Sequence, residues 1–385
     1  MGSRPYIPFN KTFIAGRELF YVAQAVEHGE IKGDGPFTKK CSEWIEQKMN
    51  IQKCLLTHSC TGALELAALL LDIKEGDEVI LPSFTFASTA NAFALRGARL
   101  VFVDISPRTF NVTPEAIEQA ITERTKAICV VHYAGVACDM QEIQAISEKY
   151  KVPVVEDAAH GVMATYKGEF LGSLGDLGTF SFHETKNYCC GEGGALLINN
   201  AKYIERAEIL REKGTNRSQF FRGEVDKYSW VDIGSSYLPS EIVAAYLYGQ
   251  LEKAEEINRE RLRLWNRYYD RLSAIPDQGL LKLPIVSEAC GHNAHMFYVL
   301  LPDIETREAV RSFLQEKGCS AVFHYVPLHS SVAGSRFGNN PDLPVTDNVS
   351  ARLLRLPLFC GLSDDDVDYV CQSLREAIEK CSGSN

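Results

Sequence analysis

The chain has 385 residues, which is long for one compact core and suits a large domain joined to a smaller one. Hydrophobic residues make up 45% and charged residues 23%, the balance of a folded globular protein rather than a disordered one. The net charge of −10 disfavours a nucleic-acid-binding protein, because neutralising phosphates requires a concentrated basic face.

Targeting segments, membrane spans and metal-binding spacings are missing from the sequence. No run of about 18 apolar residues occurs, so we expect no membrane-spanning helix. The first ten residues hold no basic stretch followed by an apolar core, so we expect no signal peptide. The twelve cysteines show no C-x-x-C spacing. We therefore expect reduced thiols, no metal site and a cytoplasmic location.

Short apolar runs and helical patterns alternate through the first 250 residues. We expect helices over 64–71, 87–96, 114–120 and 140–150, and strands over 78–81, 100–103, 127–131, 153–156, 179–182 and 195–198. Alternation of this kind predicts an α/β fold, with a mainly parallel sheet covered by helices on both faces.

The pattern changes after about residue 240. A charged amphipathic helix over 240–272 is followed by strands over 295–301 and 321–324, with a helix over 307–317 between them. This order predicts a small α+β domain. We place the large domain, with its N-terminal arm, in residues 1–250 and the small C-terminal domain in residues 251–385.

An acidic residue closes one of the expected buried strands. Asp157 ends the segment Val154-Val-Glu-Asp157, and small residues follow it. In an open α/β sheet, ligands collect at the carboxyl ends of the strands. A carboxylate there needs a buried cationic partner, and a protonated pyridinium nitrogen would serve. The alternative is that Asp157 caps a following helix.

A lysine lies in the loop after the next expected strand. Lys186 follows Ser181 and His183 and precedes the glycine-rich segment 191–194. A lysine at the mouth of a buried pocket has its pKa lowered by desolvation, which makes it an imine-forming amine and a proton carrier. The glycines permit a close approach of the backbone to a ligand. The alternative is a solvated surface lysine.

Two further segments are candidates for cofactor contacts. Segment 57–64 places polar residues and a glycine at the start of an apolar helix, where phosphate binds to free backbone amides. The alternative is a simple N-cap by Ser59 or Thr61. Segment 82–86 places aromatic residues just after a strand, where one of the rings could stack on a planar cofactor. Aromatic packing in the core is the alternative.

The order of these elements, from about residue 7 to residue 380, resembles the DegT/DnrJ/EryC1/StrS aminotransferase family. The resemblance implies fold type I with pyridoxal 5'-phosphate as cofactor. It implies that Asp157 pairs with the pyridine nitrogen and that Lys186 carries the cofactor. It also places Phe86 over the ring and His160 near the phenolic oxygen. The phosphate is implied to bind at Ser59, Cys60, Thr61 and Ser181.

A narrower resemblance rests on four segments, 183–188, 212–222, 232–237 and 322–329. They are similar to family members that aminate a dTDP-linked 4-keto-6-deoxyhexose at C4, with L-glutamate as the implied amino donor. Candidate contacts to the sugar nucleotide are Thr38, His183, Arg217, Arg222, His324, Tyr325 and His329. For the two arginines the alternative is a solvated loop, and for His324 and His329 it is a structural role.

The resemblance further implies a homodimer whose active sites are shared between subunits. Relatives carry Asn and Arg where this chain has Ser236 and Leu238, and the Asn reaches the phosphate of the partner subunit's cofactor. Ser236 keeps a hydroxyl for that contact. The pair Cys189–Cys190 beside the lysine has no role in the resemblance, and we expect two small buried hydrophobic side chains.

Several alternatives stay open at this point. One is amination at C3 or with the opposite stereochemistry. Another is a keto-sugar dehydratase of the same family, although such relatives carry histidine in place of Lys186. A cofactor-binding regulator is disfavoured because no DNA-reading helix with a basic surround accompanies the domain. A nicotinamide-dependent oxidoreductase is disfavoured because no G-x-G-x-x-G motif follows an early strand.

Overall fold

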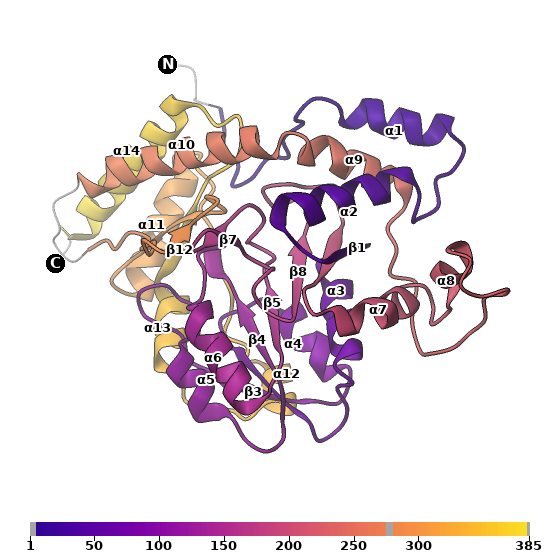
Figure 1. The fold of residues 1–385 in the computed structure, drawn as a ribbon. Helices are drawn as coiled ribbons and strands as arrows, with labels where there is room; N and C mark the ends of the chain where they lie inside the picture. Colours follow the sequence, from indigo (N-terminus) through magenta and orange to yellow (C-terminus); the bar gives the residue numbers. More distant parts are fainter. Residues whose placement is uncertain (1–4, 275–279, 383–385) are drawn as a thin grey trace.

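The computed structural model describes residues 5–274 and 280–382, and a seven-stranded sheet forms its centre (Figure 1). The strand order is β1-β9-β8-β5-β4-β2-β3. The strands are β1 (Lys53–Thr57), β2 (Glu78–Pro82), β3 (Arg99–Val103), β4 (Thr125–Val131), β5 (Val154–Asp157), β8 (Leu177–Ser181) and β9 (Gly194–Ile198). Only β9 runs against its two neighbours, so the sheet is mainly parallel as predicted.

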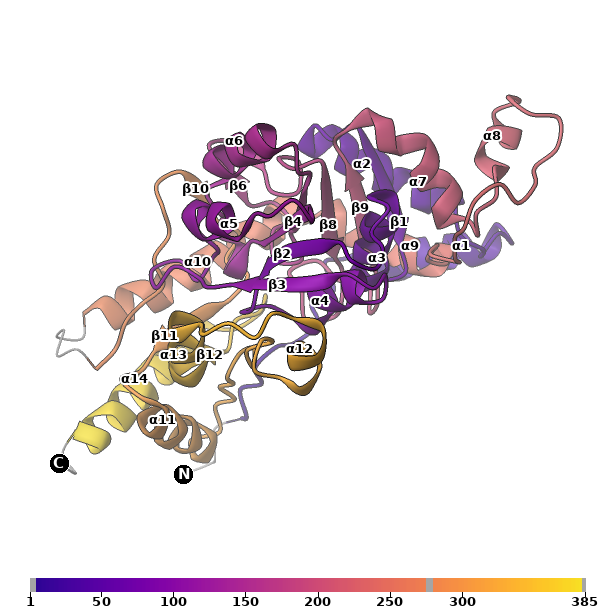
Figure 2. The same ribbon diagram turned by 90° about the horizontal axis from the view of Figure 1, so that it is seen from below.

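Helices cover both faces of this sheet because successive side chains of each strand point to opposite faces. Along β2, for example, Ile80 packs into one apolar core while Val79 and Leu81 pack into the other. The first core is shared with α1 (Glu18–Glu27), α2 (Pro36–Met49), α5 (Pro114–Ala120), α6 (Met140–Tyr150) and α9 (Glu241–Leu251). The second is shared with α3 (Cys60–Leu70), α4 (Ala87–Ala94) and α7 (Ile204–Arg211). Figure 2 shows this layering from below.

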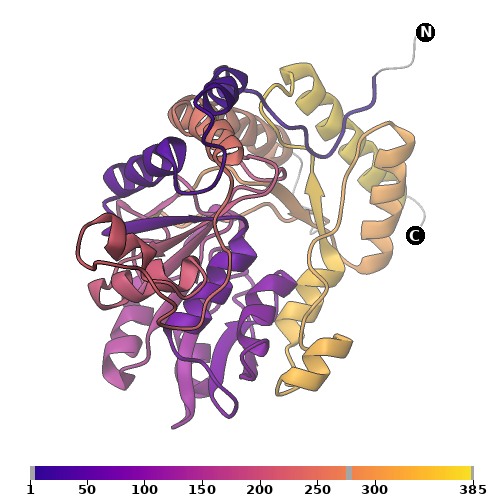
Figure 3. The same cartoon turned by 90° about the vertical axis from the view of Figure 1, so that its right-hand side faces the viewer.

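The C-terminal part of the chain has its own apolar core. It contains the antiparallel pair β11 (Phe297–Leu300) and β12 (Leu353–Leu356) and the helices α10 (Ala254–Ser273), α11 (Ile304–Glu316) and α14 (Asp364–Ser382). The N-terminal residue Ile7 also packs into this core and pairs with Cys319. Figure 3 shows this part, in orange and yellow, beside the sheet. The domain boundary predicted between residues 250 and 251 lies at the last residue of α9.

The remaining elements are short. They are α8 (Arg217–Phe221), α12 (Val332–Phe337), α13 (Pro344–Arg352), the strands β6 (Thr165–Tyr166), β7 (Glu169–Phe170) and β10 (Cys290–Gly291), and the 3₁₀ turns Tyr133–Gly135 and Ala201–Tyr203. In the described ranges, every helix is too short or too polar to cross a membrane.

Two sequence predictions about the C-terminal part are wrong in detail. The single helix expected over 240–272 is two helices, because α9 ends at Leu251 and the chain turns before α10 begins at Ala254. The strand expected over 321–324 is reduced to one bridge, in which Val322 pairs with Arg355 of β12. The chain then turns away to enclose the site described next.

Candidate active site

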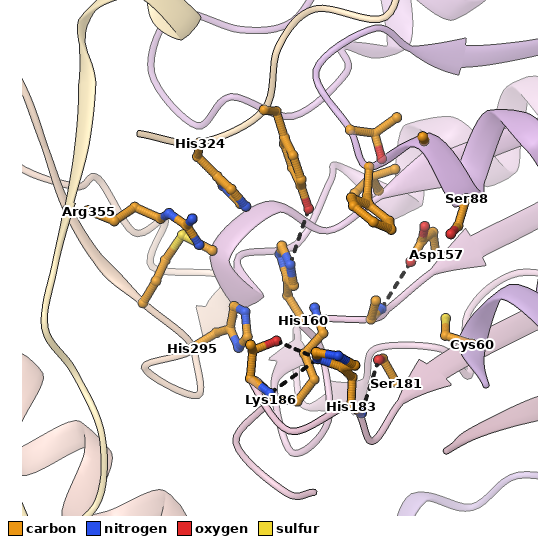
Figure 4. A pocket seen from close by; sticks show the side chains of 18 of the residues that line it. Cys60, Ser88, Asp157, His160, Ser181, His183, Lys186, His295, His324 and Arg355 are labelled. Atoms are coloured by element: carbon orange, nitrogen blue, oxygen red, sulfur yellow. Dashed lines mark hydrogen bonds between the residues drawn. The ribbon is translucent and has the colours of Figure 1, made fainter. Parts of the chain in front are cut away.

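A cavity of about 970 Å³ lies where the carboxyl ends of the central strands meet the C-terminal part (Figure 4). Asp157 at the end of β5 and Ser181 at the end of β8 line it from the sheet. Arg355 of β12 lines it from the opposite side. Of the residues predicted from sequence, those that line the cavity are Ser59, Cys60, Thr61, Phe86, Asp157, His160, Ser181, His183, Lys186, His324 and Tyr325.

The Asp157 carboxylate is buried, with 5% of its surface exposed. Its Oδ2 accepts a hydrogen bond from the Thr89 hydroxyl at 2.6 Å, and its Oδ1 accepts one from the Ala159 backbone N–H at 3.1 Å. No helix follows it, so Asp157 is not a helix cap. Among the described residues it makes no salt bridge, and a buried carboxylate without a cation fits a positively charged ligand atom.

Lys186 reaches the same cavity from the loop after β8. Burial lowers the pKa of its ammonium group from the ordinary range to about 8. The Asp157 carboxylate opposes this fall, and the Arg355 guanidinium adds to it. A substantial fraction of the Lys186 amine is therefore neutral and nucleophilic near neutral pH. This contradicts the alternative of a solvated surface lysine.

The N-terminus of α3 forms another wall. Ser59 is the N-cap, and its hydroxyl accepts the Gly62 N–H at 3.0 Å. The Thr61 hydroxyl shares a hydrogen bond with Ser88 at 2.8 Å. Burial raises the pKa of the Cys60 thiol, so it stays protonated. The free N-terminal amides of this helix line the cavity wall, where an anion could be bound.

Two glycines allow backbone segments to approach each other closely near the N-terminus of α3. A Cβ atom on Gly194 would lie 2.4 Å from the backbone nitrogen of Cys60. Glycine at this position therefore lets β9 approach the start of α3 closely. Gly193 lines the cavity itself, and a Cβ there would lie 2.4 Å from Cys190 Sγ. Cys189 is buried and Cys190 half-buried, as expected for small apolar side chains.

Two aromatic residues after β2 have different surroundings. Phe84 is buried among the rings of Phe110 and Tyr133. Phe86 has 62% of its surface exposed and lines the cavity. Packing in the core therefore accounts for Phe84 and not for Phe86. The Phe86 ring is available to cover a planar ligand.

Three imidazoles line the cavity together. His160 stacks on His295 with ring centroids 4.1 Å apart, and its Nε2 lies 3.3 Å from the Tyr325 hydroxyl. His324 stacks on Tyr325 at 3.7 Å and bonds the Tyr133 hydroxyl at 2.9 Å. Burial lowers the pKa of all three histidines well below the ordinary value, so they are neutral at pH 7.

The backbone of Tyr325 is unusual. Its φ of +34° lies in the left-handed region, which is uncommon for a bulky residue. Strained backbone of this kind concentrates at ligand sites, where the surrounding structure holds it in place. His183 stands at the rim, where its Nδ1 bonds the Thr185 hydroxyl at 3.0 Å and its Nε2 lies 3.6 Å from Glu192.

Five predicted contact residues lie outside this cavity in the same chain. Thr38 is buried at the start of α2, where its N–H and hydroxyl donate to Glu241. His329 is buried behind the cavity, and its Nδ1 bonds Ser83 at 2.7 Å. These contacts are those of structural residues, the alternative already weighed for His329.

The other three lie on the segment between α7 and α9, which projects from the molecule (Figure 2). Arg217 pairs with Glu212 at 2.5 Å, and Arg222 pairs with Glu208 and Glu224 at 2.7 Å. Ser236 is exposed and forms a bridge with Glu212. The structure does not bring these residues to the cavity of their own chain.

Sequence reasoning missed several residues at this site. They are Ser88, Thr89, His295 and Arg355. Arg355 carried a signal, because it is a lone charge within the apolar strand Leu353-Leu-Arg-Leu356. Thr89 carried none, since its contact with Asp157 joins residues 68 positions apart.

The residues present fit pyridoxal phosphate. An unpaired buried carboxylate, an amine with a lowered pKa, a helix N-terminus and an exposed ring face one cavity. These groups match the ring nitrogen, aldehyde, phosphate and ring face of that cofactor. The fold and the cavity thus define an aminotransferase that uses pyridoxal 5'-phosphate.

The chain belongs to the DegT/DnrJ/EryC1/StrS aminotransferase family, whose model matches residues 13–375. The structure is similar to that of the aminotransferase TlmJ from Streptoalloteichus hindustanus, with 30% identity and a TM-score of 0.90. That comparison covers 98% of this chain and 100% of TlmJ. The family resemblance is confirmed.

Two further structures agree. The putative sugar aminotransferase Spr1654 from Streptococcus pneumoniae, in its PMP form, has 26% identity, a TM-score of 0.90, and coverage of 98% of this chain and 100% of that chain. DesV from S. venezuelae has 29% identity, a TM-score of 0.88, and coverage of 98% and 99%. Spr1654 is also known in a PLP form. The predicted fold class and cofactor are therefore confirmed.

Proposed function

We propose that this chain transfers the amino group of L-glutamate to C4 of dTDP-4-keto-6-deoxy-D-glucose, giving dTDP-4-amino-4,6-dideoxy-D-galactose. This is the reaction of dTDP-4-amino-4,6-dideoxygalactose transaminase, which supplies a precursor of enterobacterial common antigen. The observation that carries the proposal is that Lys186 and Asp157 face one cavity of about 970 Å³. A cavity at the upper end of the usual size range suits a sugar nucleotide together with a cofactor.

Two side chains carry the chemistry in this proposal. Pyridoxal phosphate, when bound, supplies an electron sink for the charge left on the donor's α-carbon. Asp157 holds a proton on the ring nitrogen by offering it a buried negative charge. Lys186 would bind the cofactor through Nζ and, once released, would take the proton from the donor's α-carbon and deliver it to C4′ of the cofactor. Its pKa of about 8 suits both directions of proton transfer.

The remaining cavity residues orient the two ligands. The α3 N-terminus at Ser59, Cys60 and Thr61 binds the phosphate with Ser181. Phe86 covers the ring. His160, held neutral, offers a hydrogen bond to the phenolic oxygen.

The sugar is assigned to the wall formed by the C-terminal part. His324 and Tyr325 line this wall and His183 lines the rim, and their polar groups would exchange hydrogen bonds with sugar hydroxyls. We further propose a cytoplasmic homodimer. Arg217 and Arg222, away from their own cavity, would bind the diphosphate in the partner's site, because guanidinium groups suit phosphate. Ser236 would reach the phosphate of the partner's cofactor.

The test is a visible spectrum of the purified holoenzyme during sequential additions. We expect the absorption of the lysine-linked cofactor to bleach with L-glutamate and to return when dTDP-4-keto-6-deoxyglucose is added. NMR of the product then shows whether the new amine is at C4 and whether it is axial. Bleaching without recovery would reject the proposed sugar, and an amine at C3 would reject the proposed position.

A further inference from the structure

Arg355 is a cation of the cavity that the proposed reaction does not yet use. It projects from β12 into the cavity on the side opposite Asp157 (Figure 4). The guanidinium carbon lies 4.7 Å from the centre of the Phe9 ring, and Nη2 donates to the Phe323 carbonyl at 3.0 Å. These two contacts fix its direction.

The guanidinium is left with unused donors. Its Nε is buried and has no hydrogen-bond partner among the described residues, and Arg355 makes no salt bridge with any of them. Arginine has five N–H donors and stays charged in proteins. Leaving such donors without acceptors is costly, so the side chain is suited to receive an anion. Other arginines of this chain, such as Arg267 and Arg222, pair with carboxylates.

Arg355 is also the cation that remains when the cofactor is in place. Within the described part of the chain, Lys186 and Arg355 are the only lysine and arginine that line the cavity. The three buried imidazoles are neutral at pH 7, and His183 at the rim faces Glu192 at 3.6 Å. Because the cofactor occupies Lys186, the Arg355 guanidinium is the positive charge left to bind an anionic group of a substrate.

We propose that Arg355 binds the α-carboxylate of the amino donor. This inference rests on the proposed function, since it assigns a contact within the same site. The α-carboxylate is bonded to the carbon that loses its proton to Lys186, so its binding group must lie close to that amine. Arg355 and Lys186 line the same cavity, so a carboxylate held by Arg355 faces the amine.

The sugar diphosphate is a less suitable partner for Arg355. The reacting C4 and the diphosphate-bearing C1 lie on opposite sides of the hexose ring. When C4 is near Lys186, the diphosphate lies a full sugar ring away from it. A diphosphate also carries more charge than one guanidinium matches. Its anchor is expected nearer the mouth of the cavity.

The test separates the two half-reactions in Arg355→Gln holoenzyme. Bleaching of the cofactor is measured against the concentration of L-glutamate, L-isoglutamine, in which the α-carboxylate is an amide, and L-glutamine, in which the γ-carboxylate is an amide. We expect the half-saturating concentration of L-glutamate to rise on the order of 100-fold in the variant, as for loss of a buried charge pair. The wild-type preference for L-glutamate over L-isoglutamine should collapse, while the ratio of L-glutamate to L-glutamine stays unchanged.

Controls keep the result interpretable. Arg355→Lys keeps the charge without the planar fork and should give an intermediate increase. Arg336→Gln changes an exposed arginine of α12 outside the cavity and should behave as wild type. Unchanged cofactor content of Arg355→Gln, measured after denaturation, shows that the site is intact.

Each remaining outcome has a defined meaning. If the wild-type enzyme is not bleached by L-glutamate, the donor in the proposed function is wrong. If the wild type is bleached and Arg355→Gln responds to L-glutamate at the same concentrations, the proposal for Arg355 is overturned. A change only in the L-glutamine ratio, or only in the concentration of sugar nucleotide needed for recovery, also overturns it.

Discussion

Lys186 and Asp157 are opposite charges on one cavity, and neither makes a salt bridge with another described residue. The Thr89 hydroxyl and the Ala159 N–H hold the carboxylate in place, and burial keeps the lysine ready to lose its proton. A protein that needed only stability would pair or expose these groups. Their arrangement is explained by a ligand that meets both.

Substitution of Lys186 by alanine should therefore remove activity and leave the fold intact. The Lys186 side chain makes no hydrogen bond with the described residues, and its backbone N–H bonds His183 O at 2.9 Å in either case. We expect no measurable turnover and no visible absorption of lysine-linked cofactor, with an unchanged circular dichroism spectrum. Lys202→Ala, at an exposed 3₁₀ turn, is the matched control. Turnover by Lys186→Ala would remove the central role given to this residue.

The lowered pKa of Lys186 predicts the pH dependence of cofactor loading. The neutral amine is the reactive form, and its fraction grows as pH rises through the pKa. The rate at which apoenzyme takes up pyridoxal phosphate should rise to a midpoint near pH 8 and then level off. An unperturbed lysine would still be gaining rate above about pH 10.

Two variants should move that midpoint in opposite directions. The Asp157 charge raises the pKa of Lys186, so Asp157→Asn should shift the midpoint to lower pH. The Arg355 charge lowers it, so Arg355→Gln should shift the midpoint to higher pH. Stopped-flow absorbance of the apoenzyme measures both. Identical midpoints in all three proteins would show that burial alone sets the pKa.

At the scale of secondary-structure elements, the sequence predicted helix bounds accurately where the signals were local. The helix bounds over 114–120 and 140–150 were confirmed to the residue, since proline opens the first and an apolar stripe marks the second. The predicted bridging helix over 240–272 failed at Glu252 and Lys253, which have no breaking signal in the sequence. Packing accompanies the turn, because Leu251 before it and Ala254 after it are both buried in the core of the large domain.

The N-terminus of helix α2 is capped by a carboxylate from helix α9. Glu241, the first residue of α9, has 1% of its surface exposed. It accepts backbone hydrogen bonds from Gly35 at 3.1 Å, Phe37 at 2.6 Å and Thr38 at 2.9 Å. These N–H groups at the start of α2 have no partner within that helix. Glu241 thus caps α2 from a distance of about 200 positions in the sequence.

Removal of this carboxylate should destabilise the protein strongly. In Glu241→Ala the buried N–H groups of α2 and the Thr38 hydroxyl lose their acceptor. We expect the free energy of unfolding to fall by about 3 kcal/mol, the cost of losing hydrogen bonds to a buried charge. Urea unfolding followed by fluorescence measures the change. Glu255→Gln, an exposed partner of Lys48, should change it by less than about 1 kcal/mol. Similar stability of both variants would contradict this account of α2.

At the scale of the whole molecule, Lys186, Asp157 and residues of the C-terminal part line one cavity. Other residues predicted to contact the ligands lie far from that cavity. The cavity residues could be predicted because β5, β8 and the α3 N-terminus each carry a recognisable local pattern. The positions of Arg217, Arg222 and Ser236 could not, because a single sequence does not state which chain's site a residue serves. A shared site in a symmetric dimer would reconcile their placement with the family resemblance.

The surface of the chain points to the same arrangement. Large apolar side chains are exposed on α1 and on the segment between α7 and α9, on the side of the large domain away from the C-terminal part (Figure 1). They are Leu19, Phe20, Val26, Phe221, Tyr228, Trp230 and Val231. Exposed apolar side chains of this kind occur at protein interfaces in soluble proteins, and this motivates a test of association.

Trp230, with 78% of its surface exposed, is the residue to change. A tryptophan buried by a partner dominates the energy of an interface, so a charge in its place should prevent association. We expect light scattering after gel filtration to give twice 42.9 kDa for the wild type and 42.9 kDa for Trp230→Glu. Val332→Glu, at a position that is 93% exposed but on α12, should keep the wild-type mass. If Trp230→Glu is a folded monomer that loads cofactor but no longer turns over, the remote residues are needed from the partner. A monomeric variant with full activity would show that each cavity is complete in its own chain.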